Sequence, residues 1–209
     1  MNGNGNSPIF ERLISDMDNT MTTITDAERA FAIQHLTSTG NAFIEAIRDL
    51  TEQQWYMRPA PGQWSASECA DHLLQTEVYF FMPTIQKMLA DAADPARRSE
   101  TAGKDDIAIS SMENRTLKIK GQPWDETAEK KIDKEALILT FKAKRKEVID
   151  WLSQTQEALR VHFTTFPGLD TLDVYQFILM ISAHTTRHTG QIEDIKELDY
   201  FPGSEGANV

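Results

Sequence analysis

The sequence PGQWSASECADHL (residues 61–73) contains the clearest helix start in the chain. Its opening proline and glycine end any helix that precedes them. Ser65 and Glu68 then match the S-x-x-E capping box, in which each side chain bonds a free backbone amide at the start of a helix. Trp64 precedes the cap and can pack against Cys69, four residues past it. The segment therefore predicts a long helix that starts next to Ser65.

This helix is predicted to run to about Leu89, with Pro83 kinking it or splitting off its last turn. A second amphipathic segment precedes it. Apolar residues recur three, four and seven positions apart within residues 26–50, which places them on one face of a helix. Gly40 interrupts that pattern and is expected to bend the helix.

Two more helical segments follow toward the C-terminus. The spacing of apolar residues predicts a third long helix over residues 133–159. Asp170 or Thr171 can cap a fourth, which should run to about Leu198. No internal repeat and no convincing second strand is visible in the sequence. Four long amphipathic helices predict an all-α fold, a four-helix bundle.

The remaining segments divide the chain into one domain and two tails. Residues 1–24 are polar and are predicted to form a flexible N-terminal tail, and residues 201–209 a short C-terminal tail. The bundle is assigned to residues 25–200. Within it, residues 90–132 are charged and weakly periodic, so we expect a long connection between helices two and three with one short helix.

Composition narrows the class of protein. Of 209 residues, 21 are basic and 32 acidic, and the net charge of -11 argues against a nucleic-acid or anionic-membrane partner. With Cys69 as its single cysteine, the chain can form neither an intrachain disulfide nor a zinc site of cysteines alone. The longest apolar stretch, residues 174–183, is far shorter than the roughly 20 residues that span a bilayer. Because the N-terminus also lacks the features of a secretory signal, we predict a cytoplasmic protein.

Three of the five histidines fall where helices should face the bundle interior. His184 and His188 are four residues apart and so share one helix face. His72 lies about two turns into the capped helix. Three imidazoles from two helices could hold a metal with one position left open, as in catalytic sites. The alternative is half-buried histidines bonded to neighbouring helices or to water.

Gln191, one turn past His188, could orient a ligand or a bound water molecule, although its position would equally suit a solvated side chain. Cys69 could close the site as a fourth ligand, but a small buried thiol in the core is favoured. His35 is expected at a surface or rim. His162 could add a ligand only if its loop folded back toward the bundle.

Acid–base partners for such a site are not evident. Glu77 and Glu193 each follow a histidine by five residues, so a regular helix points them away from it. The four tryptophans are expected to be packing anchors rather than a ligand cage. They are Trp55, Trp64, Trp124 and Trp151. No catalytic residue is therefore assigned.

Two segments resemble the DinB/YfiT-like superfamily. Residues 61–73 look like its "PGxWS…E…HL" segment, and AHTTRHTGQI (residues 183–192) looks like its "HxxxHxxQI" segment. The resemblance covers about residues 26–200. It implies a four-helix bundle with an unusual long connection between helices two and three. It also implies a divalent metal, commonly zinc or nickel, held by the residues that match His72, His184 and His188, and a homodimer.

The family's activities include S-transfer and isomerisation with low-molecular-weight thiols, and many members are assigned only as metal-dependent hydrolases. We accordingly expect a divalent-metal-dependent enzyme that transfers a low-molecular-weight thiol, its cosubstrate, to an electrophilic small molecule. Two alternatives stay open: a metal-dependent hydrolase, and a non-enzymatic metal-binding bundle that dimerises. A concave, partly apolar cavity beside the metal would favour an enzyme, and a sealed site a structural role. The substrate is left open, because residues 90–132 depart from the family's pattern.

Overall fold

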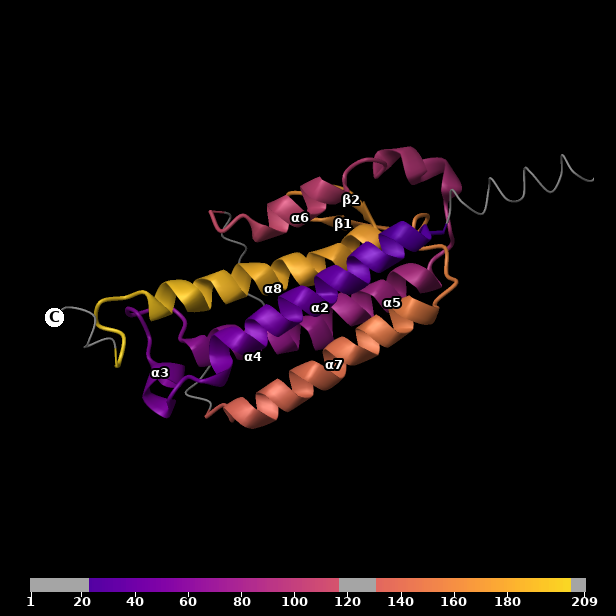
Figure 1. Ribbon diagram of the computed structural model, residues 1–209. Helices are drawn as coiled ribbons and strands as arrows, with labels where there is room; N and C mark the ends of the chain where they lie inside the picture. The colour runs from indigo at the N-terminus through magenta and orange to yellow at the C-terminus, as the bar shows by residue number, and fades with distance from the viewer. Residues whose placement is uncertain (1–22, 117–130, 204–209) are drawn as a thin grey trace, which may run out of the picture.

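The computed structural model describes residues 23–116 and 131–203. Four long helical columns lie side by side and form a bundle (Figure 1). They are α2 (Asp26–Arg48), α4 (Ala66–Thr76) with its continuation, α7 (Lys134–Gln154) and α8 (Val174–Lys196). Both α2 and α4 pack against α7 and α8, so α2 and α4 occupy opposite corners. The predicted all-α four-helix bundle is confirmed.

The smaller elements lie around this bundle. Helix α3 (Glu52–Tyr56) precedes α4. Two short helices precede α7 in the chain: the 3-10 helix η2 (Pro95–Glu100) and helix α6 (Asp105–Glu113). Helix α6 packs along the outer side of α8 (Figure 1). The connection of residues 90–132 thus carries two short helices in its described part, where one was expected. The predicted N-terminal tail falls almost entirely on residues 1–22, outside the described residues.

A β-hairpin just before α8 was missed by the sequence prediction, which found no convincing second strand. Strand β1 (Phe163–Phe166) pairs antiparallel with β2 (Asp170–Asp173). The turn contains Gly168 at φ 84°, and β2 begins with Asp170 at φ 54°. Glycine and aspartate tolerate positive φ better than most residues. Two strands of four residues each are too short for an alternating pattern to stand out.

Local capping chemistry sets the helix starts. Ser65 and Glu68 form the predicted capping box at α4. The predicted cap of the last helix is wrong, because Asp170 and Thr171 belong to β2. Asp173 is the actual cap: its side chain accepts from the amide of Gln176, whose side chain bonds back to the cap. The predicted third helix also ends early, at Gln154, and Leu159 lies in the following loop.

The column that begins with α4 changes its winding in the middle. A π-helical turn, η1 (Glu77–Phe81), separates α4 from α5 (Met82–Ala90). Pro83 lies in the first turn of α5 rather than in η1. The first turn of a helix tolerates proline, because the backbone amide that proline lacks is not needed there. The column stays helical from Ala66 to Ala90, so the last turn is not split off at Pro83 as expected; the winding changes earlier, at η1. Single π turns occur often at functional sites.

Two apolar clusters fill the bundle, and a polar layer lies between them. One cluster contains Phe81 and Phe177, and the other contains Phe43 and Phe141. In the layer between, the buried side chains of Arg145 and Glu77 form an ion pair of 2.8 Å. The layer therefore ties α7 to η1.

The same arginine ties α7 to two further helices. It donates to the Leu36 carbonyl on α2 at 2.8 Å and to the Thr185 hydroxyl on α8 at 2.9 Å. Gly40 makes room for it, since a Cβ there would lie 3.4 Å from Arg145 Nη1. Helix α2 runs unbroken through Gly40, so the expected bend does not occur.

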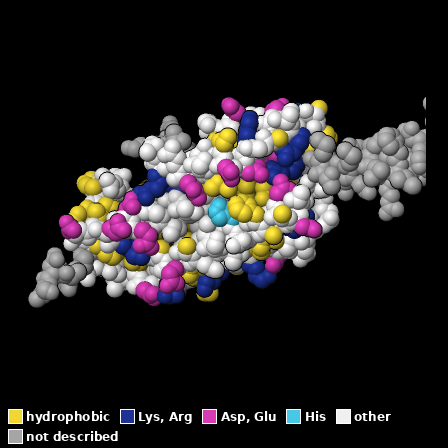
Figure 2. Space-filling model, turned by 45° about the horizontal axis from the view of Figure 1, so that its top comes forward, with side chains coloured by type: hydrophobic (Ala, Val, Ile, Leu, Met, Phe, Trp, Pro, Cys, Tyr) yellow, Lys and Arg dark blue, Asp and Glu magenta, His cyan; other side chains and the backbone are white. Residues whose placement is uncertain are grey.

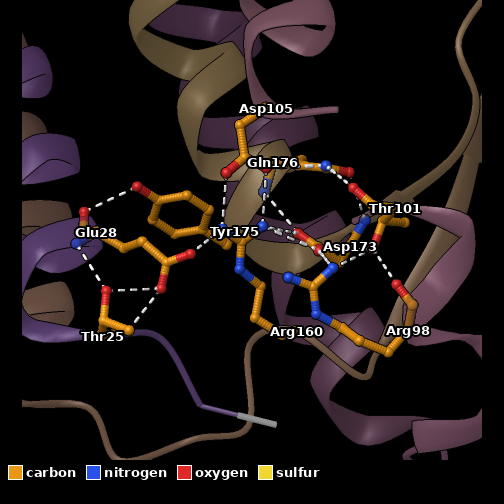
Figure 3. Close-up of polar contacts among 9 residues, drawn as sticks. All are labelled: Thr25, Glu28, Arg98, Thr101, Asp105, Arg160, Asp173, Tyr175 and Gln176. Carbon is orange, nitrogen blue, oxygen red and sulfur yellow. Dashed lines mark hydrogen bonds and ion pairs between the residues drawn. The ribbon is translucent and has the colours of Figure 1, made fainter. Parts of the chain in front are cut away.

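A second buried ionic cluster fixes the start of α8 (Figure 3). Arg160 bonds Glu28 on α2, Asp105 on α6 and Asp173 at the cap of α8. Its guanidinium lies 4.0 Å from the ring centroid of Tyr175. The cluster joins α2, α6 and the hairpin to the same end of α8. None of the described helices is long and apolar enough to cross a membrane.

Candidate metal centre

The three predicted histidines meet at the level of the polar layer. His72 reaches in from α4, and His184 and His188 from one face of α8. The Nε2 atom of His184 lies 3.3 Å from that of His72 and 3.0 Å from that of His188. Within the described ranges, this is the one group of three or more histidine, cysteine or acidic side chains whose donor atoms cluster closely enough for a metal.

The spacing of these nitrogens suits a metal ion. Two nitrogens that each lie about 2.0–2.1 Å from one tetrahedral zinc ion are about 3.3–3.4 Å apart. Two of the three pairs, at 3.3 and 3.0 Å, are close to that value, and all three donor atoms lie within 4.8 Å of one another. In a hydrogen bond between two neutral imidazoles, one Nε2 atom donates and the other accepts. Three converging Nε2 atoms therefore cannot all be satisfied by hydrogen bonds to one another. The donor set therefore fits an ion at the point where they meet.

The surroundings keep two of the histidines neutral, which is the form that binds metals. Burial lowers the pKa of His184 well below its ordinary value, and His188 and His72 add to the shift. Burial, with His72 and Arg187, lowers the pKa of His188 to about 3. His184 and His188 are thus uncharged across the whole physiological range of pH.

Aromatic rings enclose the histidine site. Trp64 lies 4.8 Å from His72 and 6.1 Å from His188 between ring centroids, and Phe81 lies 5.6 Å from His184. Trp64 was expected only as a packing anchor, yet it forms part of the site wall. The sequence carried one signal for this role. Trp64 directly precedes the α4 cap, and a residue in that position faces the first turns of the helix.

The histidines line the wall of an open pocket of about 590 Å³. Figure 2 shows histidine reaching the surface beside a group of hydrophobic side chains. The apolar side chains that line the pocket include Phe80, Phe166 and Met112. The polar side chains include Arg115, Arg187, Gln191 and Asp194. A small molecule can therefore reach the histidines from solvent.

Gln191 lines this pocket beside the histidines, half-buried rather than solvated. Its Oε1 atom is buried without a hydrogen-bond partner among the described residues. The Nδ1 atom of His188 is likewise buried and unpartnered there. Although neither atom makes a hydrogen bond of ordinary geometry, Gln191 lies close enough to act on His188 as a hydrogen-bond partner that opposes the lowering of its pKa. The orienting role of Gln191 stays a prediction.

The weaker candidates do not join the group of three histidines, although Cys69 lines the same pocket. Cys69 is buried in the core, and burial raises the pKa of its thiol to about 12, so the favoured core role holds. His162 bonds the Asp91 carbonyl through Nδ1 at 3.1 Å. His35 is half-buried on α2 and stacks on Phe31.

The two glutamates point away from the histidine site, as predicted. Glu77 pairs with Arg145 in the polar layer. Glu193 pairs with Lys196 at 2.9 Å on the outer side of α8.

Sequence reasoning missed the two arginines of the pocket. Arg187 lies inside the HTTRH segment, only one residue from His188, so its position carried a signal. Arg115 follows α6 and reaches the pocket because α6 packs on α8. Nothing local in the sequence indicates that contact.

Comparisons with known proteins agree with this arrangement. The family model of the DinB superfamily matches residues 35–192. The uncharacterized protein YuaE of Bacillus subtilis (strain 168) is 24% identical over 151 residues, which are 72% of this chain and 88% of YuaE. The solved structure of Bacillus subtilis YfiT superposes with a TM-score of 0.55 at 13% identity, covering 83% of this chain and 89% of YfiT. YfiT is described as a probable metal-dependent hydrolase with an unusual four-helix bundle topology.

Proposed function

Because the chain belongs to the DinB superfamily, we propose that it is a divalent-metal-dependent enzyme that transfers a low-molecular-weight thiol to an electrophilic small molecule. One observation carries the proposal. Three histidine Nε2 atoms converge on the wall of an open pocket of about 590 Å³. The volume is ordinary for a small-molecule site, and its mixture of apolar walls and a few polar groups is typical of one.

The open pocket favours an enzyme over a non-enzymatic metal-binding bundle. A metal that only stabilises a fold is usually closed off by four protein ligands. Here three imidazoles face a cavity, and no fourth histidine, cysteine or acidic ligand joins them within the described ranges. A position facing the cavity would therefore be left for a substrate or cosubstrate.

His72, His184 and His188 would hold the ion, for which we propose zinc or nickel because imidazole suits both. A divalent ion held by three neutral imidazoles would lower the pKa of a thiol or a water molecule in the pocket. Trp64 and Phe81 pack against the histidine rings. Gln191 would orient the group that reacts.

The side chains of the pocket favour thiol transfer. The thiol hydrogen leaves as a proton, a sulfur–carbon bond forms, and the leaving group departs with its electron pair. A free thiol has a pKa of about 8.5, so it needs a far smaller shift than water to become anionic at neutral pH. Asp194, the carboxylate that lines the described pocket, is paired with Arg115 and is a poor general base. Cys69 stays protonated, so the sulfur has to come from a cosubstrate.

Hydrolysis is the second candidate. The fold likeness to YfiT, described as a probable metal-dependent hydrolase, favours it. A water molecule would then replace the thiol, and the same three histidines would serve.

An assay of the metal-loaded protein tests these proposals. Glutathione or cysteine would be offered with a chloro-dinitrobenzene electrophile, and a nitrophenyl ester would be offered without thiol. We expect thiol-dependent release of chloride that is lost in His188→Ala, while the surface variant Lys87→Gln retains it. Ester cleavage without thiol, lost in the same variant, would overturn thiol transfer in favour of hydrolysis. Neither reaction above the His188→Ala background, in a protein that binds metal, would favour the non-enzymatic bundle.

A further inference from the structure

The pocket wall carries two arginines from separate parts of the chain. Arg187 lies on α8 between His184 and His188, and Arg115 follows the end of α6. Both line the same cavity as the three histidines. The thiol chemistry proposed above uses neither of them.

Specific contacts hold this arginine pair in place. Arg115 forms an ion pair with Asp194, one turn and a half beyond His188 on α8. The guanidinium of Arg187 donates to the backbone carbonyl of Asn114, the residue next to Arg115. The end of α6 is therefore bonded to α8 beside the histidines.

A glycine in the middle of α8 allows the approach. A Cβ at Gly190 would lie 3.2 Å from Nη1 of Arg115, which is tighter than ordinary contact. Glycine inside a helix costs about 0.5–1 kcal/mol relative to alanine. The space that Gly190 leaves is occupied by the Arg115 side chain, so the arginine lies directly along the α8 backbone at the pocket.

The pocket is positive in a protein that is strongly negative. Its charged lining residues among those described are two arginines and one aspartate, which leaves one net positive charge beside neutral histidines. The whole chain has a net charge of -11. The Arg187 guanidinium reaches the Asn114 carbonyl, so it lies beside Arg115. Two repelling cations are thus held together next to the candidate metal, which would add further positive charge.

We propose that the substrate carries a carboxylate bound by Arg187 and Arg115, with its apolar body against Phe80, Phe166 and Met112. The inference rests on the proposed function only in placing the reacting group of that substrate at the histidines. A planar guanidinium binds a carboxylate with two parallel hydrogen bonds, and a carboxylate between the two arginines would relieve their repulsion. Phe80 and Phe166 lie against Phe177, which precedes His184 by seven residues on α8, whereas Arg115 pairs with Asp194, which follows His188 by six. An amphipathic acid that reached from one group to the other would therefore pass the histidines.

Binding of matched small probes to the metal-loaded full chain tests the inference. Calorimetry would compare 3-phenylpropionate, the neutral 3-phenylpropanamide and phenyl phosphate. A hydrogen bond between charged groups is worth roughly 1.5–3 kcal/mol, so the carboxylate should bind about tenfold or more tightly than the amide. Arg187→Gln should remove about tenfold of the carboxylate affinity and leave amide binding unchanged. Arg48→Gln is the control, since Arg48 is also exposed and ion-paired but lies outside the pocket.

The outcomes separate this inference from the proposed function. Equal binding of the acid and the amide would overturn the arginine site. So would a carboxylate affinity that is unchanged in both Arg187→Gln and Arg115→Gln, because the acid would then bind the metal alone or another group. Tighter binding of phenyl phosphate would overturn the choice of carboxylate. Metal content is measured on every sample. Arginine-dependent binding in a chain that takes up no metal would leave this inference standing and contradict the proposed function.

Discussion

His188 illustrates how much one side chain is altered by its surroundings. Its ordinary pKa of 6.5 falls to about 3 in the folded protein. Below pH 6.5 the unfolded chain therefore takes up a proton at this residue, and the folded chain does not until far lower pH. Stability from this group is fully present above pH 6.5 and is lost as the pH falls toward 3.

We predict that the free energy of unfolding of the metal-free protein decreases as the pH is lowered from about 6.5 to 4. His188 should contribute up to about 1.4 kcal/mol for each pH unit in this window. Urea unfolding at several pH values would measure the slope in the wild type and in His188→Gln. The variant should show a shallower slope, and parallel slopes in the two proteins would refute the assignment.

The residues of the candidate site differ in how far the sequence reveals them. The i, i+4 spacing of His184 and His188 is local, so it predicts one helix face directly. Trp64 and Arg187 adjoin recognisable segments but carry no pattern of their own. Arg115 depends on α6 packing against α8, a contact between distant parts of the chain that no local signal encodes.

At the scale of the element, the capped start of α4 positions His72. Ser65 accepts from the amide of Glu68, and its hydroxyl also contacts the Ser67 hydroxyl at 2.8 Å. Ser65→Ala should reduce the free energy of unfolding by about 1 kcal/mol and weaken metal binding. Thr25→Ala, which removes the corresponding cap of α2, should cost a similar amount of stability without changing metal affinity. Denaturant unfolding and metal titration of both variants would check this, and an equal loss of metal affinity in both would count against it.

The polar layer offers a second test at this scale. Arg145→Met leaves the buried carboxylate of Glu77 without its ion-pair partner, which should cost about 3–5 kcal/mol of unfolding free energy. The double variant Glu77→Leu/Arg145→Met removes both charges, and it should recover part of that loss. Chemical unfolding of the two single variants and the double variant forms a complete cycle. Additive effects would show that the pair is not coupled.

Element boundaries were predictable where the signal is local. The S-x-x-E box gave the start of α4, and the apolar spacing gave four long helices. The hairpin and the π turn η1 were missed, and the cap of α8 was misplaced although Asp173 and Gln176 form a local capping box. Asp173 also has partners far along the chain, which no local pattern indicates. It is held by Arg160 and by Thr101 as well as by its own helix.

For the molecule as a whole, apolar periodicity predicts four packed helices but not their order around the bundle. The placement of α2 and α4 at opposite corners follows from the long connections that let α7 and α8 lie between them. The polar layer then brings a cavity and three histidines together near the middle of the bundle. A homodimer, a small-molecule substrate and a cytoplasmic location stay predictions for this chain.

The central claim is that His72, His184 and His188 bind one divalent metal. Elemental analysis of untagged protein, with the wild type beside His184→Ala/His188→Ala, tests it most directly. We expect about one zinc or nickel ion per wild-type chain, as three ligands around one ion require, and none in the variant. Circular dichroism should show that the variant keeps its helices. A wild type without metal after reconstitution, or a variant that keeps its metal at unchanged affinity, would contradict the claim.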